Sequence, residues 1–120
     1  MAIVNRVEKK VKMSKDMVIK YQILTYCFFN NIQISLSDLN CLLELSKFES
    51  VELTKFCEHI SLQGIFKSSQ SCRNALSKAE KKKLIVKEGK NKKIIKLNSN
   101  MNIQTEDTIL LDYKILSFES

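Results

Sequence analysis

The sequence predicts an α+β fold, in which several helices are followed by a β-hairpin. Apolar residues recur at helical spacing in four stretches between residues 15 and 81. Two runs rich in β-branched residues then flank a turn containing glycine, between residues 84 and 97. Apolar residues make up 44% of the chain and charged residues 28%, which is the balance of a folded globular protein.

The length of 120 residues predicts one domain. Composition divides the chain into a basic N-terminal segment (1–14), a domain with an N-terminal helix (15–97) and a C-terminal extension (98–120). In the first segment, the spacing of Val4, Val7 and Val11 allows one stripe of a helix.

The first helix of the domain is predicted from Ser14 or Lys15 to about Asn30, while the β-branched and aromatic content of this stretch also allows a strand. Its apolar residues repeat every three or four positions, so we expect them to form one buried stripe. The stripe consists of Met17, Tyr21, Leu24 and Phe28, widened by Val18 and Cys27.

Residues 32–35 alternate between apolar and polar side chains, which predicts a short strand. A second helix is expected from Ser35 or Ser37, with Asp38 well placed in its first turn. Its predicted buried face is rich in leucine: Leu36, Leu39, Leu42, Leu43 and Leu45. A third helix is predicted over about 51–63, with Gly64 as its stop.

The fourth predicted helix begins at a serine cap, Ser68 or Ser69. Helical spacing places four small or apolar residues on its buried face: Cys72, Ala75, Leu76 and Ala79. The opposite face carries amide, hydroxyl and cationic groups, namely Gln70, Asn74, Ser77 and Lys81. Arg73 is predicted on one flank of this helix and Lys78 on the other.

A β-hairpin is predicted directly after this helix. Leu84–Lys87 and Lys92–Leu97 are the two strands, and the turn of residues 88–91 contains Gly89, which tolerates a positive φ. Lysines are concentrated near the tip of this hairpin.

The residues from Ser69 to Ile85 have a polar start, an apolar i, i+3, i+4, i+7 stripe, an acidic residue and a Leu-Ile pair. This pattern resembles the winged helix-turn-helix DNA-binding family. The resemblance spans roughly 36–97. It implies a three-helix core plus a β-hairpin wing, here with an extra N-terminal helix and a C-terminal tail or strand. It also implies that the strand at 32–35 pairs with the wing. Lys83 stands where the family commonly has glycine, so we expect the helix to run on or to close differently.

Positive charge is concentrated on the fourth helix and the hairpin. The net charge is +7, and residues 65–96 hold eleven Lys or Arg against two Asp or Glu. Residues 21–64 and 97–120 are both net acidic. A concentrated basic surface attracts polyanions, so double-stranded DNA is the expected partner.

The resemblance places the helix from Ser69 in the major groove of DNA. Its side chains that are able to contact base edges are Gln70, Arg73, Asn74 and Ser77. The residues expected to contact the DNA backbone are Ser69, Lys78, Lys81, Lys90, Lys92 and Lys93. Such a protein would act as a transcriptional regulator or a replication-associated factor.

An alternative prediction is a structural or adaptor subunit of a larger assembly, such as a phage particle, that uses the same shape for protein contacts. The basic N-terminal segment and the acidic, apolar C-terminal extension favour it, because both suit docking on neighbours. The extension could add a strand to the sheet, form a dimer contact, dock on a neighbour or cover the basic surface. A homo-oligomer is compatible with both functions.

The remaining features argue against catalysis and cofactors. One histidine and two glycines leave no two-histidine site and no glycine-rich phosphate loop, so we expect no enzyme activity and no cofactor. The four cysteines are widely spaced, which predicts buried thiols and no metal site. The absence of a long apolar run predicts no membrane span, and we expect a cytoplasmic protein or, for the adaptor, a virion protein.

Overall fold

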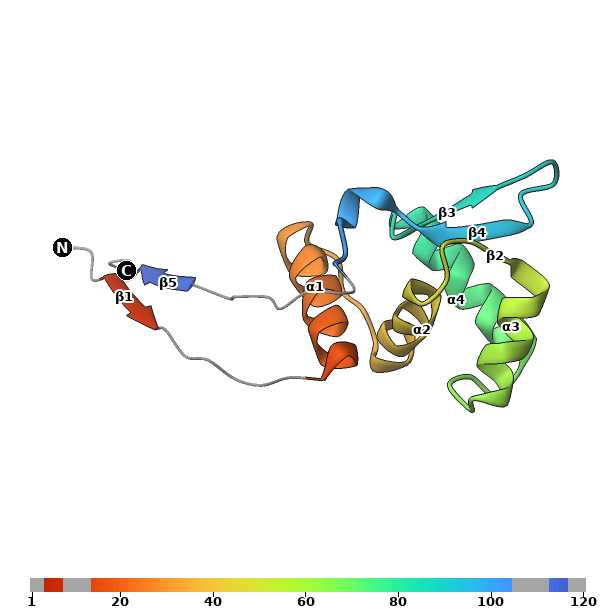
Figure 1. The fold of residues 1–120 in the computed structure, drawn as a ribbon, viewed down its shortest axis with the longest axis horizontal. Helices are drawn as coiled ribbons and strands as arrows, with labels where there is room; N and C mark the ends of the chain where they lie inside the picture. Colours follow the sequence, from red (N-terminus) through yellow and green to blue (C-terminus); the bar gives the residue numbers. More distant parts are fainter. Residues whose placement is uncertain (1–3, 8–13, 105–112, 117–120) are drawn as a thin grey trace.

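A computed structural model describes residues 4–7, 14–104 and 113–116 of the chain. Residues 14–104 contain four α-helices and a small antiparallel sheet of three strands, which confirms the predicted α+β class (Figure 1). The helices are α1 (Lys15–Phe29), α2 (Leu36–Ser46), α3 (Leu53–Leu62) and α4 (Ser69–Lys81). The strands are β2 (Val51–Glu52), β3 (Ile85–Glu88) and β4 (Ile94–Leu97), and a short 3-10 helix, η1, spans Ser99–Met101.

Serine side chains fix the start of three of these helices. Ser14, Ser35 and Ser68 each accept a hydrogen bond from the backbone N–H three residues on, at 3.2, 3.1 and 3.1 Å. This N-cap satisfies one of the backbone donors that a helix leaves free at its first turn. The predicted starts of α1, α2 and α4 are therefore confirmed, and so is Gly64, with φ +74°, directly after α3.

The sheet has the strand order β2-β4-β3, and β4 lies in the middle. The predicted hairpin is confirmed, because β3 pairs with β4 from Ile85–Leu97 to Glu88–Ile94. The predicted strand at 32–35 is wrong. The N–H of Ile32 donates to the Cys27 carbonyl, at 2.8 Å, and so closes the end of α1.

The third strand is β2, which pairs with β4 through Val51 and Ile95. Consequently α3 begins at Leu53, two residues later than predicted.

One continuous core lies between the helices and the sheet. It is made of α1, α2, α3, α4, both hairpin strands and η1, and its largest fully buried side chains include Phe56, Leu42, Leu45, Ile60, Leu76 and Ile95. Of the predicted buried residues of α4, Cys72 and Leu76 belong to it, Ala79 packs against it and Ala75 is half-buried. Leu36 does not, because it lies at the start of α2 and is 70% exposed.

Helix α1 contacts the core with a different face from the predicted one. Its buried residues are Ile19, Ile23 and Cys27, of which only Cys27 belonged to the predicted stripe. The stripe expected to be buried, Met17, Tyr21, Leu24 and Phe28, lies on the other side of the helix and is exposed. Both faces are apolar, so the spacing alone could not tell which one packs inward.

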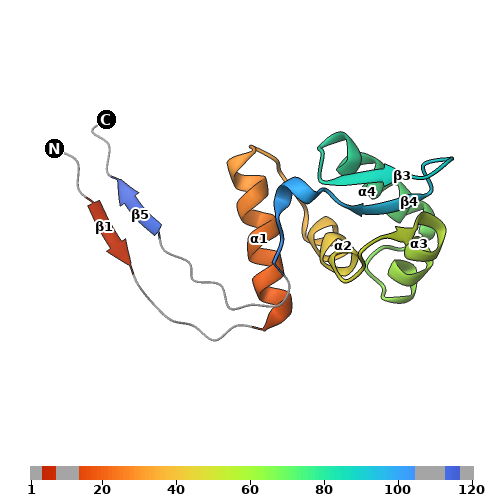
Figure 2. The ribbon, with the colours of Figure 1, turned by 45° about the horizontal axis from the view of Figure 1, so that its top comes forward.

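A separate two-stranded sheet joins the two ends of the chain. Strand β1 (Val4–Val7) is antiparallel to β5 (Tyr113–Leu116), on the α1 side of the body (Figures 1 and 2). The helix predicted through Val4 and Val7 is therefore wrong, while its third residue, Val11, lies outside the described residues. The extension does contain a strand, but that strand does not join the three-stranded sheet. The acidic residues Glu106, Asp107 and Asp112 lie outside the described residues.

Lys83 ends α4 in a left-handed conformation, with φ +61°. The N–H of Leu84 donates to the Ala79 carbonyl at 2.9 Å, so α4 closes as it would with glycine, contrary to expectation. A lysine side chain makes this backbone conformation costly. We expect Lys83→Gly to raise the free energy of unfolding by about 0.5–1 kcal/mol, measured by urea denaturation.

The matched control is Lys81→Gly, in the last turn of α4. It is expected to lower the free energy of unfolding by about 1 kcal/mol, because glycine weakens a helix. If both variants lower the free energy of unfolding equally, the backbone at Lys83 is unstrained.

Candidate nucleic-acid interface

Helix α4 presents a polar face that no described segment covers. Cys72 and Leu76 anchor the helix in the core, with exposed fractions of 0% and 1%. The predicted outer residues Gln70, Asn74, Ser77, Lys78 and Lys81 are all exposed. The structure therefore brings five of the ten predicted contact residues onto one accessible helix face.

Two amides on this face form a pair one turn apart. The Nε2 of Gln70 donates to the Oδ1 of Asn74 at 3.0 Å. This bond leaves the Oε1 of Gln70 as an acceptor and the Nδ2 of Asn74 as a donor, on two exposed side chains. Adenine presents a complementary donor and acceptor in the major groove of DNA.

Arg73 lies on the flank of α4 that faces α3, where it is half-buried. One of its terminal nitrogens donates to the Oγ1 of Thr54 at 2.9 Å. Arginine has five N–H donors, so most of them remain for another acceptor. Thr54 lies on another helix, so the sequence around Arg73 could not predict this contact. Ser69 is also half-buried, at the first position of α4.

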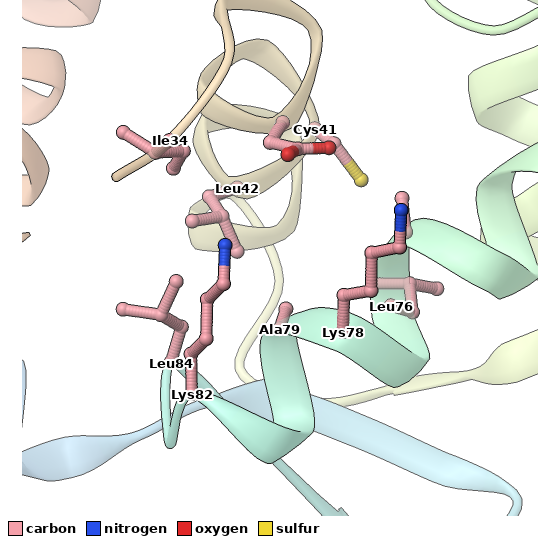
Figure 3. A pocket seen from close by; sticks show the side chains of 10 residues that line it. Ile34, Cys41, Leu42, Leu76, Lys78, Ala79, Lys82 and Leu84 are labelled. Carbon is pink, nitrogen blue, oxygen red and sulfur yellow. The ribbon is translucent and has the colours of Figure 1, made fainter. Parts of the chain in front are cut away.

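On the opposite flank, Lys78 and Lys82 reach from α4 toward α2 across a narrow groove (Figure 3). The Nζ of Lys82 donates to the backbone carbonyl of Gln33 at 3.0 Å. The free volume in the groove is about 10 Å³, which holds one water molecule at most. This groove is therefore too small for an effector, and Lys78 marks the edge of the exposed face.

The hairpin tip carries three exposed lysines, Lys90, Lys92 and Lys93. The turn is shaped by two left-handed residues, Gly89 at φ +91° and Lys92 at φ +53°. The N–H of Leu53 donates to the carbonyl of Lys93 at 2.7 Å, which ties the base of the tip to the start of α3.

Within the described part of the chain, lysines lower on the hairpin form ion pairs, whereas those at its tip do not. Lys87 pairs with Glu80 at 3.7 Å, and Lys96 pairs with Glu88 at 3.0 Å. Among the described residues, the tip lysines have no ion-pair partner. Lys67 and Lys83, which were not predicted as contacts, are also exposed and lie next to the two ends of α4. Their positions next to the predicted ends of this helix could have identified them as candidate contacts.

The single histidine belongs to a separate contact between α2 and α3. The Nε2 of His59 lies 3.2 Å from the Oε2 of Glu44, and Lys47 contacts the other carboxylate oxygen at 3.1 Å. Burial raises the pKa of Glu44, but the hydrogen bonds from Lys47 and His59 outweigh it, so the net pKa is lowered. The acid that pairs with His59 was missed because it lies fifteen residues away on another helix.

All four cysteines are buried and free, as predicted for small core residues. Burial raises the pKa of Cys57 to about 12, and a hydrogen bond with Cys41 together with burial raises the pKa of Cys72. The thiols of Cys57 and Cys72 are therefore protonated at neutral pH and pack as apolar groups. Among the residues that the structure describes, no three His, Cys, Asp or Glu side chains are grouped to hold a metal ion. Within the same residues, no helix is both long and apolar enough to cross a membrane.

No protein-family model, curated protein or solved structure matches this chain.

Proposed function

We propose that this protein binds double-stranded DNA through α4 and the β3–β4 hairpin, with a winged helix-turn-helix arrangement. The order α2, β2, α3, α4, β3, β4 supports this proposal, because it supplies three helices followed by a hairpin. The observation that carries the proposal is the exposed amide pair, Gln70 and Asn74, on a helix that runs directly into a hairpin. The lysines at the hairpin tip are exposed and make no ion pair with any residue that the structure describes.

In this proposal, different residues contact the bases and the phosphates. Gln70, Asn74 and Ser77, with the remaining donors of Arg73, contact base edges in the major groove. Lys78, Lys81 and the tip lysines neutralise phosphates, while Ser69 donates a hydrogen bond to the backbone near the start of α4. Phosphate contacts supply affinity for any sequence, and the amide pair supplies the preference for particular bases.

The test begins with selection of bound duplexes from a random library, followed by affinity measurements on the selected site and on an unrelated duplex over a salt series. Affinity should fall steeply with salt, with a logarithmic slope of about −0.9 for each phosphate contacted. Asn74→Ala is expected to reduce the preference for the selected site by about tenfold, since a good base contact contributes ~1–3 kcal/mol.

The control is Asn100→Ala, which removes an exposed amide from η1, outside this face. It should leave both affinities unchanged. A wild-type protein that binds no duplex even at low salt would contradict the proposal and favour the adaptor function.

A further inference from the structure

Helix α1 has apolar side chains on two opposite faces. One face, Ile19, Ile23 and Cys27, is buried against the core. The other face consists of Met17, Tyr21, Leu24 and Phe28, with exposed fractions of 45%, 45%, 41% and 81%. Phe29, 78% exposed, adds to this face through an edge contact with Phe28, at a ring-centroid distance of 5.7 Å. A surface helix normally has one apolar stripe, and this second stripe has no partner among the described residues.

The spacing along the exposed stripe is four, three and four residues. This is the alternation of core positions in a pair of packed helices. No charged side chain interrupts the stripe, because the charged residues of α1, Lys15, Asp16 and Lys20, lie off it. The stripe is therefore suited to pack against an identical helix.

We propose that this face joins two copies of the chain in a dimer, with the two α1 helices packed antiparallel. In this register Met17 lies opposite Phe28 of the second copy, and Tyr21 lies opposite Leu24 of the second copy. Each aromatic ring then contacts an aliphatic or thioether side chain, which is favourable packing for both. The inference does not depend on DNA binding.

Charge favours the antiparallel direction. The last turn of α1 contains no basic residue, so its partial negative charge is not compensated within the helix. In an antiparallel pair, this end of α1 lies beside the positive N-terminal end of α1 in the second copy. A parallel pair would instead place the two positive helix ends together, and likewise the two negative ends.

The area is sufficient for a stable dimer. Aromatic and long aliphatic side chains each have ~150–250 Å² of surface, so at the observed exposures the five residues present about 600 Å² per copy. Two copies therefore bury up to about 1,200 Å², which reaches the ~1,000 Å² expected of a biological interface. The hairpin tip lies at the other end of the body and stays free (Figures 1 and 2).

Sedimentation of the full chain over a range of concentrations tests the dimer. The wild-type protein should sediment as a dimer, and Leu24→Glu should raise the dimer dissociation constant by at least ~30-fold. The control is Leu62→Glu, at an 89% exposed leucine on α3, which should leave that constant unchanged. Circular dichroism checks that each variant is folded. A monomeric wild-type protein, as expected if the chain covers this stripe itself, would overturn the proposal.

Cross-linking tests the direction of packing. The double variant Met17→Cys/Phe28→Cys should form a disulfide-linked dimer under mild oxidation, because the two positions face each other in the antiparallel register. Met17→Cys alone should not cross-link. Efficient cross-linking of that single variant would overturn the antiparallel arrangement.

Discussion

Replacing Lys90 and Lys93 by glutamine is expected to weaken binding to every duplex by roughly 10–100-fold near 0.1 M salt. Both lysines are exposed at the hairpin tip and have no ion-pair partner among the described residues. If each contacts one phosphate, the logarithmic salt slope should become shallower by about 2. Fluorescence anisotropy with a labelled duplex measures both quantities. Lys92 is left in place because its backbone is left-handed, which keeps the turn undisturbed.

A matched variant separates local contacts from overall charge. Lys15→Gln/Lys47→Gln removes the same charge from α1 and from the end of α2. Lys15 lies on the helix at the far end of the body from the hairpin tip (Figure 1). The logarithmic salt slope of this double variant should equal that of the wild-type protein. If both double variants shift the slope equally, the hairpin is not the phosphate-binding element.

Truncation of Leu45 to alanine is expected to cost about 2–5 kcal/mol of stability. This leucine is 0% exposed at the end of α2, so its removal leaves a cavity among close-packed neighbours. A small domain has only ~5–15 kcal/mol in total, so the loss approaches the unfolding threshold. Urea denaturation followed by circular dichroism gives the change in unfolding free energy.

Leu62→Ala is the paired control, since the same atoms are removed from a side chain that is 89% exposed. Its effect should stay within about 0.5 kcal/mol. A cost at Leu45 no greater than that at Leu62 would contradict the placement of Leu45 in the core.

Local signals in the sequence predicted most of the helix limits and the hairpin. Serine caps and glycine stops act on the adjacent residues, so Ser14, Ser68 and Gly64 could be identified directly. The outer face of α4 followed from its own periodicity, because only one of its faces is apolar. Gln70, Asn74, Ser77, Lys78 and Lys81 are exposed for this reason.

The errors arose where a distant residue decides the local structure. Val51 joins a strand only because Ile95 of β4 pairs with it. Ile32 is a local exception, because its N–H donates to the Cys27 carbonyl and closes the end of α1. The buried side of α1 is chosen by the neighbouring core, since both of its sides are apolar. The contacts of Arg73 with Thr54 and of His59 with Glu44 likewise join separate helices.

The central position of β4 has a consequence for the order of folding. Strands β3 and β4 are close in sequence, whereas β2 precedes both α3 and α4 and meets β4 only after them. Contacts between distant segments form late, because a long loop must close before they are gained. We therefore expect the helices and the hairpin to assemble first, with Val51 and Glu52 docking onto the free edge of β4 as a final, slower step.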